Sequence, residues 1–478
     1  MSETFDRKTR PYLYYDQTTS VCATCLMRVE AKIVIQDERV WMEKWCPQHG
    51  RERVMIAHDV AYWRSARESY LKVGEMPERF QTGMRWGCPY DCGLCPDHQQ
   101  HACVCVVEIT DHCNLHCPVC FADSGPHRPG FRTLDEVAAM FDAIVRAEGR
   151  PDVVQISGGE PTLHPQLAEI LAMAKARPIR HLMLNTNGLR IATDPALVAL
   201  LAAHKPGFEV YLQFDSLDDA GTLPLRGARL LEKRMQALER LDEAGISTTL
   251  VCTLARGVND TQVGALIDFA LTRRCVRGVT FQPVEQAGRI AGAGAPTNRI
   301  TLTEARELIL TQSSLFAPHD LIPVPCHPET LAMGYALKLG GQVVPLSGLL
   351  DTQTLVSSTP NTIIYERFPE SRALVANCFS TGIGPEGSAE RLGQLLCCLP
   401  QVQAPELSYE NVFRVLIVRF PDAHDFDIRS AKKSCIHFAR PDGRIIPFEM
   451  YNLFYRDDRR QRLDQLRAQV EAGWGRVG

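Results

Sequence analysis

Apolar positions in the middle of the chain follow two alternating patterns. Six short and almost continuous apolar runs begin at residues 104, 152, 181, 209, 247 and 278. Between them, apolar residues recur every three or four positions, in the stretches 134–147, 166–176, 194–204, 227–245 and 261–274. Short continuous runs are typical of strands buried on both faces, and the wider spacing is typical of amphipathic helices. The pattern predicts a parallel sheet of six strands with helices on its outside.

Six strand–helix units are fewer than the eight of a closed barrel, so we expect an α/β fold built on a partial (β/α)6 barrel. The first hundred residues carry two cysteine groups and little regular periodicity. After the barrel, the chain predicts an α+β extension with one clear strand at 413–420 and a terminal amphipathic helix at 457–474. The expected division is a cysteine-rich metal domain, an iron–sulfur segment, the barrel and the C-terminal extension, at 1–75, 76–103, 104–292 and 293–478.

Composition narrows the class of protein. The formal net charge is -4, so no basic excess indicates a nucleic-acid partner. No segment approaches the roughly 18 uninterrupted apolar residues of a membrane span, which predicts a soluble cytoplasmic protein with at most peripheral membrane contact. The chain has 18 cysteines. Because the cytosol keeps thiols reduced, we expect these cysteines to bind metals or serve redox chemistry instead of forming disulfides.

The stretch CNLHCPVCF places Cys113, Cys117 and Cys120 in the loop that follows the first barrel strand. Chemistry in parallel barrels sits in such loops, at the carboxyl ends of the strands. A zinc site usually takes four ligands as two pairs, whereas three cysteines on a [4Fe–4S] cube leave one iron open for a substrate or cofactor. A zinc or electron-transfer site with a distant fourth cysteine is the alternative.

Polar residues follow the next strands at the points where they end. After the second strand comes SGGEP, in which two glycines and a carboxylate can approach a ligand closely. We expect a cofactor site at this edge of the sheet, formed by Ser157, Gly158, Gly159, Glu160, Asn185, Asn187, Gln213, Asp215, Ser216 and Arg226. Taken singly, each of them could equally be a helix cap or a strand-end turn.

The three-cysteine loop together with the Gly-Gly-Glu-Pro loop resembles the radical S-adenosylmethionine (SAM) superfamily. The resemblance implies that Cys113, Cys117 and Cys120 hold a [4Fe–4S] cluster that binds SAM, and that a reductant such as flavodoxin or ferredoxin supplies an electron. It also implies that Glu160 and its glycines meet the methionine amine. Asn187 and Asp215 would then lie near the nucleoside, with Arg226 at the carboxylate. Many members have an aromatic residue where this chain has Val119, which weakens the adenine contact expected there.

Two further cysteine groups lie upstream. Cys88, Cys92 and Cys95 repeat the spacing of the first loop, and Cys103 follows them, which predicts an auxiliary [4Fe–4S] cluster with no open iron or, alternatively, zinc. Cys105 lies within the first strand and is expected to pack there. Two pairs about twenty residues apart predict a mononuclear zinc or rubredoxin-like iron site, formed by Cys22, Cys25, Cys46 and His49.

The segments 92–103, 113–122, 323–338 and 420–448 resemble one branch of the superfamily, which contains archaeal tetraether lipid synthases and radical methylases of a dihydropterin. Members of the branch often carry a further cluster in the C-terminal region. Here Thr330 and Ser434 stand where cysteines are expected. The alternative to a cluster is a set of inert buried thiols at the five C-terminal cysteines, Cys326, Cys378, Cys397, Cys398 and Cys435.

Three functions compete. The first is a radical SAM enzyme that forms a C–C bond on an unactivated carbon of a lipid tail, and the second is a radical SAM methyltransferase acting on a pterin-like heterocycle. The third is an iron–sulfur electron-transfer protein, which has no need of the Gly-Gly-Glu-Pro loop. Apolar residues after Cys326 could line a lipid channel, but a helix with a buried face is the favoured interpretation of Leu331, Met333, Tyr335 and Leu337.

Overall fold

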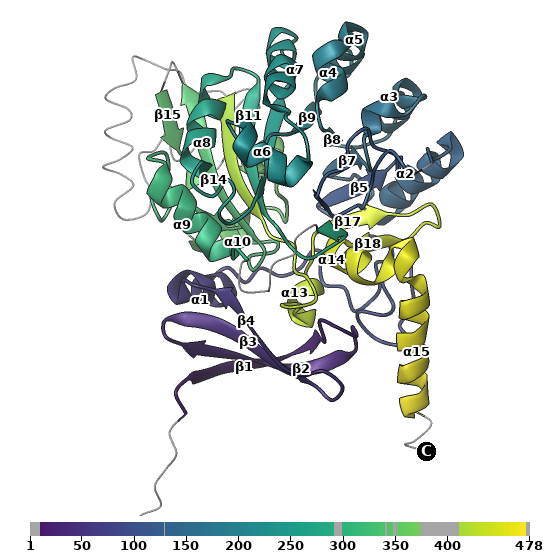
Figure 1. Cartoon of the computed structure of the whole chain (residues 1–478), viewed down its shortest axis with the longest axis vertical. Coiled ribbons are helices and arrows are strands. Elements are labelled where there is room, and N and C mark those ends of the chain that lie inside the picture. The colour runs from purple at the N-terminus through teal and green to yellow at the C-terminus, as the bar shows by residue number, and fades with distance from the viewer. Residues whose placement is uncertain are drawn as a thin grey trace, which may run out of the picture.

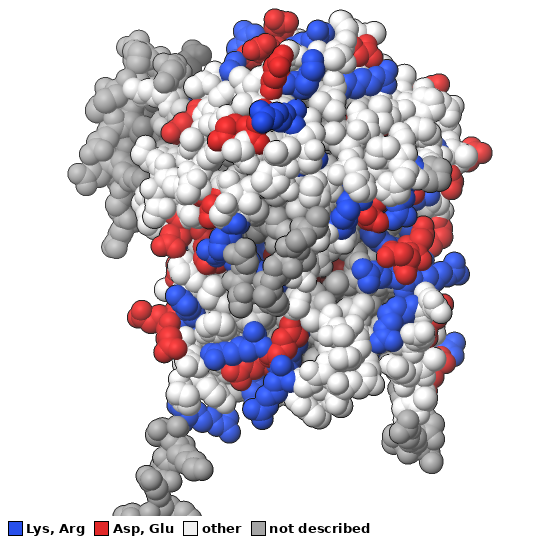
Figure 2. All heavy atoms as spheres, in the orientation of Figure 1, with Lys and Arg blue, Asp and Glu red and all other residues white. Residues whose placement is uncertain are grey.

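The computed structural model describes residues 10–128, 130–290, 299–339, 342–347, 350, 352–371, 373 and 411–474. The chain forms a small N-terminal sheet beneath a large twisted sheet that helices cover on the outside, and a terminal helix runs down one side (Figure 1). Positive and negative side chains are interspersed over the face in Figure 2, in keeping with the small net charge. No helix within these ranges is long and apolar enough to cross a membrane.

The N-terminal sheet is an antiparallel meander that the periodicity did not predict. Its order is that of the chain, with β1 Leu13–Val21, β2 Arg28–Gln36, β3 Arg39–Cys46 and β4 Gly50–Ala57, followed by helix α1 Val60–Glu68. Along β2 and β3, buried and exposed residues alternate, because one face packs on α1 and the other faces solvent. The buried face includes Ile33, Val40, Met42 and Trp63.

Six parallel strands form the centre of the large sheet and confirm the predicted partial barrel. Neighbours in the sheet follow chain order, with β5 Val104–Glu108, β7 Val153–Ser157, β8 His181–Thr186, β9 Phe208–Gln213, β10 Thr248–Leu254 and β11 Val276–Pro283. The outer helices are α2 Leu134–Glu148, α3 Leu167–Lys175, α4 Leu189–Thr193, α5 Pro195–Ala202, α6 Asp219–Arg226, α7 Leu231–Glu243 and α8 Val263–Thr272. One apolar core joins the strands to these helices.

The C-terminal extension adds strands to both ends of this sheet. At one end, β16 Val412–Val418 runs parallel to β11, and β14 Leu331–Leu339 pairs with β16. Beyond them lie β13 Ile322–Pro323 and β15 Gln342–Pro345. At the other end, β17 Ile436–Ala439 runs parallel to β5 and is followed by β18 Ile445–Pro447.

The helix expected over Leu331, Met333, Tyr335 and Leu337 is wrong, because these residues lie in strand β14. Their spacing of two places all four side chains on one face, which a strand explains better than a helix. The face packs in a buried cluster with Val324 and Val418.

The remaining elements flank the sheet. They are η1 Pro161–Leu163, α9 Leu302–Gln312, α10 Thr352–Ser358, η4 Tyr365–Arg367, α13 Ile428–Ala431, α14 Phe448–Met450, the π-helical turn η6 Tyr451–Tyr455 and η7 Asp457–Arg459. The terminal helix is α15 Arg460–Trp474, and its Leu463 and Leu466 are buried as expected. Cys378, Cys397 and Cys398 lie outside the described residues.

Candidate active site

The loop between β5 and α2 carries Cys113, Cys117 and Cys120. Midway along this loop, a short strand, β6 Val119–Cys120, pairs with β12 Arg289–Ile290 from beyond the barrel. Arg289 then donates three hydrogen bonds to the loop, to the Cys117 carbonyl at 2.7 Å, the Asp123 carboxylate at 2.8 Å and the Ser124 carbonyl at 2.6 Å. A distant segment therefore holds the cysteine loop in place.

A single cavity brings most of the predicted site together. Its wall includes the three cysteines and residues from the ends of the next three strands, namely Cys113, Cys117, Cys120, Gly158, Gly159, Asn185, Asn187, Gln213 and Arg226. Burial raises the pKa of the Cys113 thiol to about 12. Metal coordination stabilises a thiolate in such a site. Three thiols from one loop beside an open cavity fit a [4Fe–4S] cluster with one coordination position left for a ligand.

The two glycines let the second loop lie against the cysteine loop. Gly158 has φ of +130°, and a Cβ there would meet the Thr110 carbonyl oxygen at 2.2 Å. At Gly159, a Cβ would meet the His112 carbonyl oxygen at the same distance. Since neither clash can be relieved without moving backbone, larger residues at these positions would displace the loop that carries the cysteines.

Glu160 lies behind the cavity wall and is absent from its lining. Its Oε1 accepts from the Thr162 and Thr186 hydroxyls at 2.6 and 2.7 Å, and its Oε2 accepts from the Asn187 backbone N–H at 2.8 Å. Burial raises the pKa of this carboxyl group, and these donors oppose the rise. The arrangement ties the second and third strand-end loops together, so Glu160 positions Asn187. Contact of Glu160 with the methionine amine stays a prediction.

Asp215 also forms its hydrogen bonds within the protein. Its carboxylate accepts from Arg226 at 2.7 and 2.5 Å and from Arg234 at 2.8 Å, and it does not line the cavity. Burial opposes ionisation of Asp215, but the two guanidinium groups outweigh burial and lower its pKa well below the usual range. Ser216 also lies outside the lining, because its hydroxyl bonds Asp218 and Gln262 where α6 begins. Asp215 therefore serves as an anchor for two arginines.

Arg234 is a site residue that the sequence reasoning missed. It is 1% exposed, it lines the cavity, and its Nε and Nη2 find no hydrogen-bond partner among the described residues. Two guanidinium groups against one carboxylate leave a net positive charge at this wall, which suits a carboxylate ligand. The signal was a charged residue on the buried face of α7, in line with Ala237, Leu238 and Leu241.

An inner cavity lies inside the barrel and shares residues with the first. The shared wall consists of Phe121, Asn185, Gln213, Gln282, Phe420 and Phe448. Ser157 lines the inner cavity and begins a hydrogen-bonded chain across the strand ends. Asn185 donates to the Ser157 hydroxyl at 3.1 Å, Gln213 donates to Asn185 at 3.2 Å, and Arg226 donates to Gln213 at 2.8 Å. The two cavities thus meet at a boundary of amide and phenylalanine side chains.

Cys88, Cys92 and Cys95 lie under the terminal segment of the chain. The hydrogen bond with the neighbouring Cys88 thiol, followed by burial, raises the pKa of the Cys92 thiol. The Asp91 carboxylate accepts three backbone N–H bonds from the preceding turn, at 2.6 to 2.8 Å. Tyr455 accepts from the Cys92 N–H at 2.7 Å. These hydrogen bonds fix the backbone on both sides of Asp91.

The structure does not place Cys103 with these three cysteines. Its thiol groups instead with those of Cys326 and Cys435, and the three sulfur atoms lie within 4.8 Å of one another. The expected fourth ligand of the auxiliary cluster is therefore corrected, because strand β17 and the turn before β14 bring remote cysteines to Cys103. Three cysteines would leave one iron of that cluster without a cysteine ligand.

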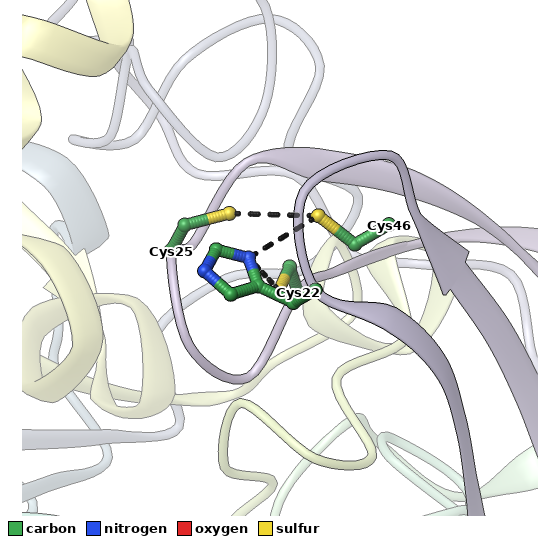
Figure 3. Close-up of side chains that lie close together, drawn as sticks. Cys22, Cys25 and Cys46 are labelled. Atoms are coloured by element: carbon green, nitrogen blue, oxygen red, sulfur yellow. Dashed lines mark hydrogen bonds between the residues drawn. The ribbon is translucent and has the colours of Figure 1, made fainter.

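The predicted N-terminal site is assembled by the meander, at the turns before β2 and after β3. The ligand atoms of Cys22, Cys25, Cys46 and His49 lie within 4.8 Å of one another. Figure 3 shows the three cysteine side chains pointing toward one another. The Cys25 and Cys46 sulfurs are 3.8 Å apart, and His49 Nδ1 is 3.5 Å from both Cys22 and Cys46. This ligand set and spacing fit one tetrahedral metal ion.

Comparison with known proteins decides the class. A family model described as the radical SAM superfamily matches residues 107–270. The protein is a radical SAM enzyme. A second model, the HMPTM N-terminal zinc ribbon domain, matches residues 14–58, so the four-residue metal site belongs to a zinc ribbon. Radical SAM enzymes bind a [4Fe–4S] cluster and SAM, and the electron-carrier alternative is set aside.

Relatives cover the chain to different extents. The 7,8-dihydro-6-hydroxymethylpterin dimethyltransferase of Methanocaldococcus jannaschii is 28% identical, over 92% of this chain and 94% of that protein. The GTP 3',8-cyclase of Chlorobaculum tepidum is 30% identical over 39% of this chain and 57% of its own. The crystal structure of Streptococcus suis SuiB bound to S-adenosylmethionine is 17% identical, with a TM-score of 0.37 over 45% of this chain and 49% of that chain.

Proposed function

We propose that the protein is a radical SAM methyltransferase that acts on a pterin-like heterocycle. The similarity to a dihydropterin dimethyltransferase extends over nearly the whole of both chains, which supports this substrate class over the lipid tail that the sequence first favoured. The observation that carries the proposal is the inner cavity, which adjoins the cysteine loop and presents amide side chains among apolar ones.

The amides of the inner cavity suit a flat ring with amide-like edges. Gln155 on β7 lines the cavity, and its amide has no hydrogen-bond partner among the described residues. Gln282 lies close by and donates to the Tyr211 hydroxyl at 3.3 Å. An amide offers both donors and acceptors, as the edges of a pterin do. A hydrocarbon tail would leave such groups unpaired, at a cost of about 1–3 kcal/mol each.

The residues of the outer cavity would serve the cofactors. Cys113, Cys117 and Cys120 would hold the cluster, which when bound supplies the electron that cleaves SAM. Arg234, supported by Asp215, would bind the SAM carboxylate. Glu160 would keep the two strand-end loops in register, and the phenylalanines at the boundary would exclude water from the inner cavity.

The partners follow from this chemistry. We expect a small-molecule substrate, an external one-electron reductant of the flavodoxin or ferredoxin kind, and no nucleic acid. Because the metal sites need reduced thiols, we place the enzyme in the cytoplasm. The divisions 1–75, 76–103, 104–292 and 293–478 stay our proposal for the domains.

Product analysis tests the proposal. The reconstituted enzyme is incubated with SAM, a reductant and either a dihydropterin carrying a hydroxymethyl group or an isoprenoid lipid. We expect mass spectrometry to detect one or more added methyl groups on the pterin and no change in the lipid. Coupled lipid tails with an unchanged pterin would overturn the proposal and restore the lipid interpretation.

A further inference from the structure

A second group of metal-ligating side chains lies away from the SAM cavity. Cys103, Cys326 and Cys435 are each 2% exposed or less, and their sulfur atoms lie within 4.8 Å of one another. The Cys326 and Cys435 sulfurs are 3.7 Å apart, and His101 Nε2 is 3.4 Å from the Cys103 sulfur. We propose that Cys103, Cys326 and Cys435 hold a second mononuclear zinc ion, and that His101, which stands outside this group of three, turns its Nε2 from the Asn361 carbonyl toward the ion as the fourth ligand. This inference is independent of the proposed substrate.

The spacing fits one ion in place of an iron–sulfur cube. A Zn–S bond of about 2.3 Å and tetrahedral angles put two sulfur ligands roughly 3.8 Å apart. The zinc ribbon of the same chain has the same ligand types and a 3.8 Å sulfur pair, and its histidine lies within 4.8 Å of all three cysteines, which His101 does not yet do. A cube spreads its cysteines over separate irons. Accordingly, the three sulfur atoms of the SAM loop, which is expected to hold a cube, do not all lie within 4.8 Å of one another in the described chain.

His101 is oriented as a metal ligand. Its Nδ1 lies 2.9 Å from Glu148 Oε2, and the other Glu148 oxygen accepts from the Ala102 N–H at 3.1 Å. A carboxylate on one ring nitrogen fixes the orientation of the ring and is typical of histidines whose other nitrogen binds a metal. In this structure Nε2 also lies 2.6 Å from the Asn361 carbonyl oxygen, a contact that coordination would replace.

The positions of the three cysteines indicate a structural role for the ion. Cys103 directly precedes β5 and Cys435 directly precedes β17, whereas Cys326 lies in the turn between β13 and β14. β5 and β17 lie near one end of the large sheet, and β13 and β14 lie at the opposite end. An ion shared by the three cysteines would therefore join the two ends of the sheet and fasten the C-terminal extension to the barrel.

Metal analysis of the full-length reconstituted chain tests the inference. We expect two zinc ions per chain in the unmodified protein and one in each of the variants Cys46→Ser and Cys435→Ser. Cys275→Ser is the matched control, because Cys275 is buried in the barrel core away from these groups, and it should keep both ions. Iron and sulfide should match the unmodified protein in Cys435→Ser. A Cys46→Ser variant without zinc, or loss of iron in place of zinc from Cys435→Ser, would overturn the site.

Two further measurements leave all the proposed ligands of this site unmutated. Zinc X-ray absorption of Cys46→Ser should show three sulfur ligands at about 2.3 Å and one nitrogen at about 2.0 Å. In the same background, Glu148→Gln should weaken zinc binding in competition with a chromogenic chelator by roughly 10- to 100-fold. The exposed Glu169→Gln should leave it unchanged. An all-oxygen zinc shell, or equal affinities in both variants, would count against the proposal.

Discussion

Arg234 donates from Nη1 to Asp215 Oδ2 at 2.8 Å, although both side chains are almost completely buried. Asp215 also holds Arg226, so one carboxylate serves two cations. Such an arrangement is costly unless a further anion completes it, because burying an unpaired charge is strongly unfavourable. The second anion expected beside the cysteine loop is the carboxylate of SAM.

Replacing Arg234 by Met should therefore weaken SAM binding without removing the cluster. A charge-assisted hydrogen bond contributes about 1.5–3 kcal/mol, so the dissociation constant for SAM should rise roughly 10- to 100-fold. Equilibrium binding to the reconstituted enzyme measures the change, and iron content verifies the cluster. Lys233→Met on the exposed side of the same helix is the control. Unchanged SAM affinity in Arg234→Met would remove this residue from the site.

Arg289 should matter for cluster assembly more than for overall stability. Its three hydrogen bonds fasten residues 117–124, so Arg289→Ala should let the loop move and lower the cluster content after reconstitution. We expect a loss of at least half of the SAM-binding cluster, read from iron content and electron paramagnetic resonance. Arg256→Ala removes a more exposed pair with Glu304 and should leave the cluster intact.

The two three-cysteine loops should respond differently to the loss of one ligand. Cys117→Ala should abolish SAM cleavage and keep the absorbance of the auxiliary cluster. Cys92→Ala should retain cleavage, measured as 5'-deoxyadenosine, but uncouple it from product. Equal loss of cleavage in both variants would contradict the assignment of the SAM-binding loop.

Fold and site differ in how far the sequence could predict them. The six barrel strands were readable because strands buried on both faces form continuous apolar runs. The spacing of two in β14 was also present but was taken for a helix face, and the half-buried strands of the N-terminal meander escaped notice.

The sequence predicted which cysteines bind metals better than it predicted which of them share one site. Cys103 follows Cys95 closely in sequence, so it was expected to close that cluster, yet folding brings it to Cys326 and Cys435. The strand-end rule found most of the cavity wall but could not tell an exposed carboxylate from one occupied by the protein, as in Glu160 and Asp215. The position of a residue after a strand predicts at which edge of the sheet it lies. The direction of its side chain depends on neighbours that are distant in sequence.

The free energy of unfolding should decrease as pH rises, because the buried Glu449 side chain then loses its proton. Burial raises the pKa of this carboxyl group to about 7, and Ser434 donates its one side-chain hydrogen bond within the described chain, at 3.1 Å. Between the unfolded pKa near 4.3 and pH 7 the folded state holds more protons, so this contribution is present at low pH and is lost on the way up. The loss amounts to about 4 kcal/mol. Denaturant unfolding at pH 5 and pH 8 measures the free energy of unfolding at each pH. In Glu449→Gln, the decrease between the two pH values should be smaller by most of this amount.

The inner cavity offers the sharpest test of the substrate, through Gln155. Its amide has no partner among the described residues, so a pterin edge should satisfy it, and Gln155→Leu should remove that hydrogen bond at similar volume. Losing one bond to a buried polar edge costs about 1–3 kcal/mol, which predicts a fall in kcat/KM for the pterin of roughly 5- to 150-fold. SAM affinity should not change, because Gln155 lies outside the outer cavity. The exposed Gln461→Leu controls for adding an apolar residue. If the substrate were a hydrocarbon tail, leucine would improve its fit and kcat/KM would rise. A rise in kcat/KM with lipid would therefore reverse the assignment.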